Sequence, residues 1–546
     1  MGKENLRNIL ICLSLFVITL STRLLVAPGN NSFTSYDSGN YCLASISYSI
    51  ENDRPHLPGY FLYVQLVKNI YQITHNFYYS LLFLSILFSS ISSVFVYLIL
   101  KNYFKIIQSY LLTLIILFNP LVWFYGSSTE IYAFDLFFSS LVFYTGIQRN
   151  GIYFLPILIA LGTGVRQTSG LLLLPLCFYF LYRSIKDKEL EWNLFITSLV
   201  PCILAFLLWF IPMTNSVGGI NNYIELSTHH NPIPRNLISG GISSLAKNLV
   251  GLASYGIFPA IPTLVSLLFY FINKFFGKAV SYKNTTDTKK PPLSLLNERT
   301  SGVKNKSFKR NSLIRIGFWL IPPILFFMFI YYAKGYILLV FPVIIIIPSF
   351  FILKNLIGNK MLFFILVLQV AVFLFFPCYY PHYEDNSNYK NRALSKIDLT
   401  IDRFFSYYSM SYSHLKDLEM YYKEIDSLLT KSRINSEIDI FIDPTIIPNQ
   451  RVLQVIYPSR AFLRYDHTDY DRYWIYKGID NVKLSDLETG IRYSAIISSN
   501  MFFKKYLINY TNESLSTNHF TLFIPMQEKI GIIKDVYNNY FQKIGY

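Results

Sequence analysis

The sequence predicts a mainly α, polytopic membrane helix bundle of about eleven spans, followed by a smaller extracytoplasmic α/β domain. Three observations predict this fold class: long apolar runs, few charged residues, and basic residues concentrated in alternate loops. Of the 546 residues, 52% are hydrophobic and only 15% are charged. A soluble protein of this length needs far more charged side chains to cover its surface.

The apolar runs define the candidate spans. A helix crosses a bilayer core of about 30 Å with roughly 20 apolar residues. The eleven candidates are 9–26, 78–100, 106–124, 131–147, 152–164, 171–181, 194–213, 249–272, 316–332, 337–353 and 361–376. The fifth and sixth are short, and one re-entrant hairpin is the alternative there. The first span follows Lys3 and Arg7 as in a signal peptide, but no small-residue cleavage site comes after it, so we expect it to be uncleaved.

The basic residues predict the orientation of the spans. Loops expected inside the cytoplasm are rich in Lys and Arg, above all 274–310, which holds eight Lys and two Arg. Cytoplasmic loops of membrane proteins favour these residues. We therefore expect a cytoplasmic N-terminus and an exterior tail after residue 376. The net charge of +16 then reflects membrane topology and not nucleic-acid binding.

Side chains suited to chemistry gather in the loops expected outside. They are Asp37, Arg54, His56 and Tyr60 in the first outer loop (27–77), Glu130 in the next, and Arg166, His229, His230, Lys334 and Tyr336 in later loops. Cationic side chains at helix ends can hold a lipid-linked phosphate at the interface. A carboxylate close by can take the proton of an acceptor hydroxyl as it attacks a sugar. Their placement on one face favours sugar transfer from a polyprenyl phosphate.

Each of these residues also has an ordinary structural interpretation. Asp37 could belong to a turn or act as an N-cap, and Glu130 could stabilise a helix N-terminus through the helix dipole. Arg166 and Lys334 could be snorkelling anchors, and the two adjacent histidines could be plain loop residues. Asp135, about one turn inside the fourth span, could pair within the bundle.

Two segments of the first outer loop carry a family resemblance. Asp37-Ser38-Gly39, followed by Arg54-Pro55-His56-Leu57-Pro58-Gly59-Tyr60, resembles the first-loop signature of the GT-C superfamily, polytopic glycosyltransferases that use lipid-linked phosphosugars. Within the superfamily, these segments are similar to those of protein O-mannosyltransferases and bacterial aminoarabinose transferases. The match is partial, because Leu57 replaces a proline of that motif and Arg54 stands at the place of its basic residue. Segments 123–132, 164–168 and 334–336 resemble later motifs, so the resemblance covers roughly residues 1–378.

The resemblance implies roles for these residues. Asp37 would be the general base, and Glu130 the second acid, orienting the acceptor or a metal. The donor phosphate would be held by Arg54, Arg166, Lys334 and Tyr336, and the substrate positioned by His56, Tyr60, His229 and His230. Some members of the superfamily use a divalent metal, so Mg²⁺ or Mn²⁺ stays open as a cofactor.

The resemblance also implies partners and a location. The donor would be a sugar on dolichyl or undecaprenyl phosphate, and the acceptor a hydroxyl of a glycan, lipid or protein. The membrane would be a bacterial inner membrane or the endoplasmic reticulum. A transporter or lipid flippase is the alternative function, and a non-catalytic scaffold that presents the tail is a third.

The composition changes after the last span. Residues 379–546 are expected to form the extracytoplasmic α/β domain, after a transmembrane domain over 1–378. Residue patterns predict helices over 404–431, 449–456 and 501–507 and strands over 438–442, 461–465, 493–498 and 520–524.

The predicted orientation can be tested with reporters fused at Asn150, Lys290 and Tyr546. A reporter active only in the cytoplasm should work at the first two positions and fail at Tyr546, because the positive-inside rule places an odd number of spans before the tail. A cytoplasmic reporter signal at Tyr546 would contradict this topology.

Overall fold

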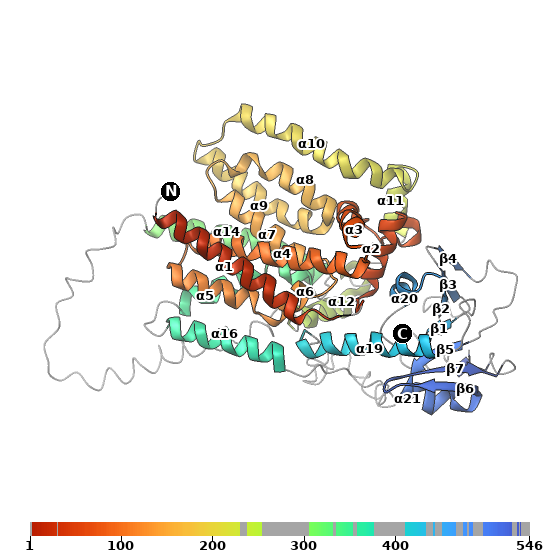
Figure 1. Cartoon of the computed structure of the whole chain (residues 1–546). Helices are drawn as coiled ribbons and strands as arrows, with labels where there is room; N and C mark the ends of the chain where they lie inside the picture. Colours follow the sequence, from red (N-terminus) through yellow and green to blue (C-terminus); the bar gives the residue numbers. More distant parts are fainter. Residues whose placement is uncertain are drawn as a thin grey trace, which may run out of the picture.

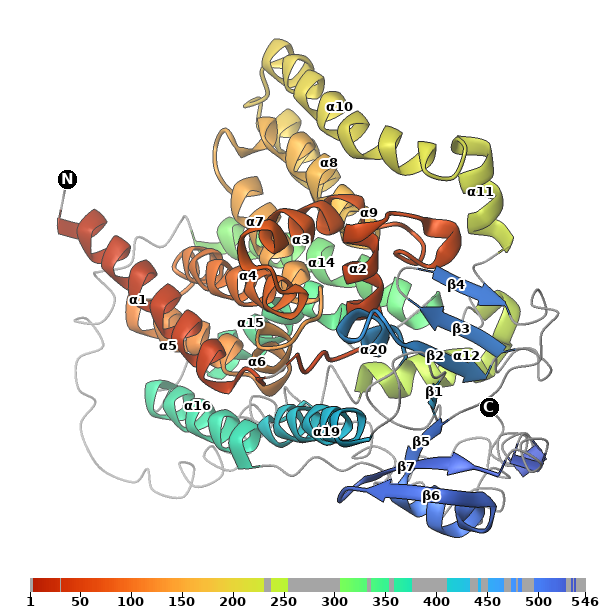
Figure 2. The same ribbon diagram turned by 45° about the vertical axis from the view of Figure 1, so that its right-hand side comes forward.

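The computed structural model describes residues 3–29, 31–229, 237–253, 305–330, 335–352, 358–375, 410–432, 440–442, 450–465, 473–477, 480–483, 495–526, 532–533 and 535–536. Helices form a bundle, and a mixed sheet lies at the end of the bundle opposite the start of α1 (Figures 1 and 2). Helices α2 and α3 lie at this same end.

Each predicted span that falls on described residues is helical. The bundle helices are α1 (Lys3–Val26), α4 (Phe77–Leu100), α5 (Ile106–Leu117), α6 (Pro120–Gly126), α7 (Ala133–Gly146), α8 (Leu155–Val165), α9 (Gln167–Lys186), α10 (Trp192–Asn215), α12 (Leu237–Leu252), α14 (Asn305–Phe329), α15 (Phe341–Ile352) and α16 (Gly358–Phe375). Within the described part of the chain, five helices are long and apolar enough to cross a membrane, or six if α5 and α6 form one span. The total of eleven stays a prediction, and the span 249–272 lies mostly outside the described residues.

Serine residues allow α4 to pack closely in the middle of the bundle. α4 contacts both α1 and α7. Its buried small side chains are Ser85, Ser89, Ser90, Ser92 and Ser93. Small residues let helices approach closely inside a membrane, where lipid removes most of the hydrophobic drive for association. On the outside of the bundle, α10 instead exposes large apolar side chains such as Leu204 and Leu208.

The third predicted span, 106–124, is broken in the structure. α5 and α6 meet at an angle of 66°. Pro120 lacks an N–H to continue α5, and the Asn119 side chain accepts a hydrogen bond from the Leu121 N–H at 3.2 Å, which starts α6. Arg23 of α1 is fully buried at the break and donates to the Leu117 carbonyl at the end of α5.

Residues 27–77, predicted as the first outer loop, contain two helices. α2 (Tyr36–Ile46) packs against α3 (Phe61–Thr74), and α3 packs against α4 and α8. The hydrophobic face of α3, which includes Tyr63, Val64 and Val67, is buried. α3 therefore has one apolar face that packs on the bundle, although this helix is too short and too polar to span the membrane.

The tail forms a seven-stranded sheet with the order β4-β3-β2-β1-β5-β7-β6. β1 (Ile440–Ile442) pairs in parallel with β2 (Ala461–Tyr465) and with β5 (Ala495–Ser499), and the other pairs are antiparallel. The predicted strands correspond to β1, β2, β5 and β7 (Phe520–Pro525). The sequence missed β3 (Tyr473–Lys477), β4 (Asp480–Lys483) and β6 (Thr511–Ser516). The polar strands β4 and β6 gain their structure only by pairing with neighbouring strands.

Two tail helices pack on the bundle. α19 (Tyr412–Lys431) contacts α16, and α20 (Gln450–Ile456) contacts α2. The Tyr422 hydroxyl of α19 donates to the Phe33 carbonyl at 3.0 Å, and the His414 ring stacks on Phe124 at 5.4 Å. The tail helices therefore share one hydrophobic core with the bundle.

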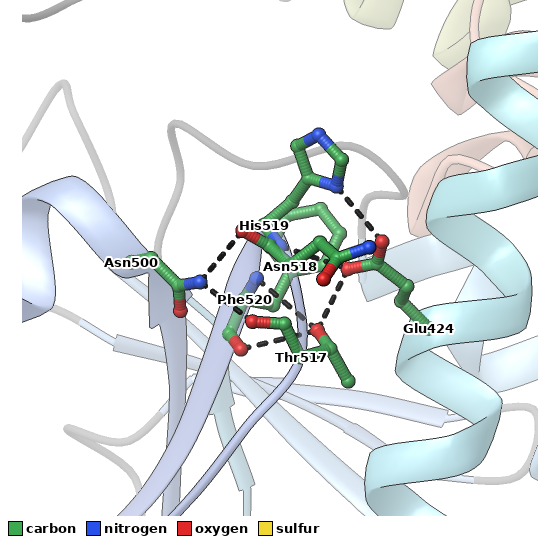
Figure 3. A network of polar contacts seen from close by, with 6 residues as sticks. All are labelled: Glu424, Asn500, Thr517, Asn518, His519 and Phe520. Carbon is green, nitrogen blue, oxygen red and sulfur yellow. Dashed lines mark hydrogen bonds and ion pairs between the residues drawn. The ribbon is translucent and has the colours of Figure 1, made fainter.

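Glu424 of α19 fixes the β6–β7 hairpin to that helix (Figure 3). Its carboxylate accepts hydrogen bonds from the Thr517 hydroxyl at 2.7 Å and from the His519 N–H at 2.9 Å. His519 Nδ1 lies 2.8 Å from the other carboxylate oxygen. The sheet is thus attached to a helix that itself packs on the bundle.

Arg23→Met should destabilise the bundle, because it removes charge-assisted hydrogen bonds at the broken helix while keeping side-chain length. We expect a loss of about 1.5–3 kcal/mol, seen as a lower thermal unfolding temperature in detergent. Arg7→Met, on the exposed start of the same helix, is the control and should leave that temperature nearly unchanged. Equal effects of the two variants would contradict a role for Arg23 at the break.

Candidate functional site

Asp37 lies in the first turn of α2. Ser35 is the N-cap of this helix, since its side chain accepts a hydrogen bond from the Ser38 N–H at 3.3 Å. The interpretation of Asp37 as the cap is therefore wrong. The Asp37 carboxylate is 38% exposed, and its Oδ1 lies 3.5 Å from His56 Nδ1. A carboxylate in this position is accessible to an incoming hydroxyl group.

The segment that carries His56 is held from several sides. Three side chains donate to the carbonyls of Pro58 and Gly59: Gln167 Nε2 at 3.1 Å, Tyr223 Oη at 2.9 Å and Tyr48 Oη at 2.7 Å. Gly59 has φ 114°, and a Cβ there would lie 2.8 Å from the Tyr48 hydroxyl. Only glycine fits this position, so the Pro-Gly pair fixes the chain beside His56.

Arg166 lies between α8 and α9 and is only 2% exposed. It forms an ion pair with Asp135 of α7, and Asp135 also accepts a hydrogen bond from Ser169. The Arg166 Cζ lies 4.7 Å from the ring centroid of Tyr132 and 4.3 Å from that of Tyr336. The carboxylate and the two rings offset the loss of hydration. The alternative of a snorkelling Arg166 is therefore wrong, and Asp135 does pair within the bundle.

Tyrosine rings connect Arg166 to Asp37 and His56. The Tyr60 hydroxyl interacts electrostatically with the Arg166 guanidinium group. The Tyr60 ring centroid lies 5.1 Å from that of His56 and 5.3 Å from that of Tyr41. Burial raises the pKa of the Tyr60 and Tyr41 phenols above their ordinary value, so both stay protonated donors at neutral pH.

Glu130 lies in the turn between α6 and α7 and is 8% exposed. Its charge interacts electrostatically with the phenols of Tyr63 and Tyr132, and the Tyr132 ring covers Arg166. α7 begins at Ala133, and the acid in its first turn is Asp135. Capping of α7 therefore does not explain Glu130.

Hydrogen bonds fasten the Glu130 turn to the start of α2. The Ser38 hydroxyl donates to the Thr129 carbonyl at 3.1 Å, and the Thr34 N–H donates to Thr129 Oγ1 at 3.0 Å. These hydrogen bonds join the chain next to Asp37 to the chain next to Glu130. The first-loop and second-loop segments are thus one structural unit.

The structure brings together most of the predicted site residues that it describes. Asp37, His56, Tyr60, Arg166 and Tyr336 form a continuous set of contacts, which Glu130 joins through Tyr132. Arg54 is buried, and its backbone pairs with Ser49. His229 is the last residue of α11 (Ile220–His229), and its side chain lies outside the described part. His230 and Lys334 also lie outside the described residues, although Gly335 packs on Tyr132.

Three tyrosines of the site were missed from the sequence. Tyr41, Tyr63 and Tyr132 were not candidates, because aromatic residues are common throughout an apolar chain. One signal was present: Tyr41 lies one helical turn after Asp37, and Tyr132 is two residues after Glu130. Among the described residues, no group of three or more His, Cys, Asp or Glu side chains could hold a metal ion.

The chain is similar to known proteins in sequence and in fold. Residues 37–191 match the family model described as the protein O-mannosyl-transferase TMEM260 N-terminal domain. This stretch begins at Asp37 and includes Glu130 and Arg166. The fold is also similar to the apo crystal structure of ArnT from Cupriavidus metallidurans, with a TM-score of 0.52 and 10% identity over 96% of this chain and 98% of that one. The chain therefore has the fold of this ArnT structure.

A second crystal structure of the same ArnT, bound to undecaprenyl phosphate, gives a TM-score of 0.51 at 11% identity, covering 95% of this chain and 97% of that one. No curated protein matches the sequence. The predicted helix bundle with a C-terminal α/β part is confirmed, while the number of spans and the side of the tail stay predictions. The match extends over nearly the full length of these structures. The chain thus resembles a membrane glycosyltransferase in fold and in its N-terminal segment.

Asp135→Asn should destabilise the GT-C-like bundle, because it leaves the Arg166 guanidinium buried without its countercharge. Breaking a buried ion pair costs about 3–5 kcal/mol. Asp187→Asn is the matched control, since Asp187 pairs with Arg183 at 2.6 Å on the surface of α9 and contributes about 0.3–0.5 kcal/mol. Thermal unfolding in detergent measures both, and similar small shifts would show that the Arg166 charge is not buried as described.

Proposed function

We propose that the chain is a glycosyltransferase that moves a sugar from a polyprenyl phosphate to a hydroxyl acceptor on the non-cytoplasmic side of the membrane. The observation that carries this proposal is the exposed Asp37–His56 pair beside the buried Arg166, with Tyr60 between them. Attack of a hydroxyl on a lipid-linked phosphosugar requires a base for the hydroxyl proton and a cation for the phosphate. The transmembrane part would hold the donor, and the tail, residues 379–546, would form the extracytoplasmic domain.

Buried polar atoms on Arg166, on its neighbour Gln167 and on α2 and α3 support a polar ligand in this part of the structure. Atoms without a hydrogen-bond partner among the described residues include Arg166 Nε, Gln167 Oε1, the Tyr63 hydroxyl and both polar atoms of the Asn40 amide. Buried polar groups are normally hydrogen-bonded, so these donors and acceptors fit a phosphate and sugar hydroxyls. The similar ArnT structure with undecaprenyl phosphate bound supports the same class of donor.

The phosphate needs more positive charge than Arg166 alone provides. Asp135 neutralises Arg166 and fixes one edge of its guanidinium group, which leaves Nε available for hydrogen bonding. We therefore assign additional charge to Arg54 and Lys334, with Tyr336 stacked on Arg166. His229 and His230 remain candidates for positioning the substrate.

The reaction would proceed by direct displacement. Asp37 takes the proton of the acceptor hydroxyl while its oxygen forms a bond to the anomeric carbon of the sugar. The bond from that carbon to the phosphate oxygen breaks, and polyprenyl phosphate leaves as the anion held near Arg166. His56 keeps the Asp37 carboxylate in place, and Glu130 orients the acceptor. If a divalent metal binds, it would supply charge stabilisation at the phosphate.

Asp37→Asn should lower sugar transfer about 10²–10⁴-fold, because the amide cannot take up the proton. Transfer is measured in membranes supplied with polyprenyl phosphate carrying radiolabelled mannose or, separately, aminoarabinose. Asp53→Asn is the matched control, since Asp53 is an exposed acid of the same outer segment and should keep full activity. Retained transfer by Asp37→Asn would contradict its role as the base.

A further inference from the structure

Helix α20 of the tail presents polar side chains to the bundle. Gln450, Arg451 and Gln454 are 3%, 1% and 0% exposed. Such side chains are rarely buried unless they are hydrogen-bonded. Their burial in a seven-residue helix indicates that α20 makes specific polar contacts where it meets α2.

Arg451 contacts both ends of the outer segment that carries Asp37 and His56. Its Nε donates to the Tyr36 hydroxyl at 3.3 Å, and its Nη2 donates to the Asn52 carbonyl at 2.8 Å. The Tyr36 ring centroid lies 5.9 Å from the Arg451 Cζ. Tyr36 directly precedes Asp37, and Asn52 lies shortly before His56. One guanidinium group therefore fixes the distance between the two parts of the segment.

The backbones of α2 and α20 touch at Gly39. A Cβ at Gly39 would lie 2.9 Å from the Arg451 carbonyl carbon and 3.0 Å from the Val452 nitrogen. Neither atom can move aside, since both belong to the backbone. The glycine two residues after Asp37 is thus required by the tail, and Arg451 lies directly over the first turn of α2.

We propose that Arg451 is a positioning residue for sugar transfer: from the tail, it holds Tyr36 and Asn52 so that Asp37 and His56 keep their mutual geometry. This inference rests on the proposed function. The arrangement makes the tail part of the catalytic unit, because Arg451 and Tyr36, 415 positions apart in the sequence, meet next to Asp37.

The test compares Arg451→Gln and Arg451→Lys with Arg460→Gln in the full-length protein. Arg460 is the matched control, since its side chain donates to the Leu429 carbonyl at 3.4 Å and its backbone to Tyr457, both within the tail. We expect Arg451→Gln to lower kcat for transfer between about 10-fold and 100-fold with little change in KM for the donor, because misplacement of a catalytic group acts on kcat. Arg451→Lys should recover part of this loss, and Arg460→Gln should transfer at the wild-type rate.

A second measurement separates this inference from the proposed function. Hydrogen–deuterium exchange over residues 36–56 should rise in Arg451→Gln and stay at the wild-type level in Arg460→Gln. Unchanged exchange, or raised exchange with an unchanged kcat, would overturn the positioning role. If the wild-type chain transfers no sugar from either donor, the proposed function fails, while the exchange result still decides whether Arg451 holds the segment.

Discussion

The buried charge of Arg166 is the constraint on which the arrangement of the site depends. A guanidinium group removed from water must be compensated nearby. Its compensation comes from Asp135 on α7, Tyr132 before α7, Tyr336 after α14 and Tyr60 before α3. These groups lie far apart in the chain, so the requirements of one side chain bring together the loops that carry the candidate chemistry.

The contacts of the site form three layers: one in the bundle around Arg166, one at the surface around Asp37, and one in the tail. Arg166 and its rings lie in the bundle, and the Asp37–His56 pair lies above them at the surface. Ser38 and Thr129 join the two acidic segments. The tail contacts this unit through Arg451 and Tyr422, so that the segment with Asp37 and His56 is held by both the bundle and the tail. A rigid support of this kind is what precise placement of a base needs.

Sequence reasoning reached the bundle, the helix positions and the grouping of Asp37, His56 and Arg166, because each leaves a local signal. Apolar runs mark helices, and Asp-Ser-Gly and Pro-Gly are short motifs. It missed the break at Pro120 and the polar strand β6, whose structures depend on Arg23 and on pairing with β7. It also left two roles possible for Arg166, a snorkelling anchor or a phosphate ligand, because a local sequence pattern does not show whether a side chain is buried.

By itself the sequence determined the membrane class, the positions of most helices and the residue types at the outer ends, because hydropathy and charge act over windows of about 20 residues. Only the tertiary structure decided that Asp135 neutralises Arg166, that tyrosines link it to the Asp37–His56 pair, and that Arg451 reaches back to Tyr36. These contacts join residues tens to hundreds of positions apart. The packing of the whole chain, and not any local pattern, fixes which of them meet.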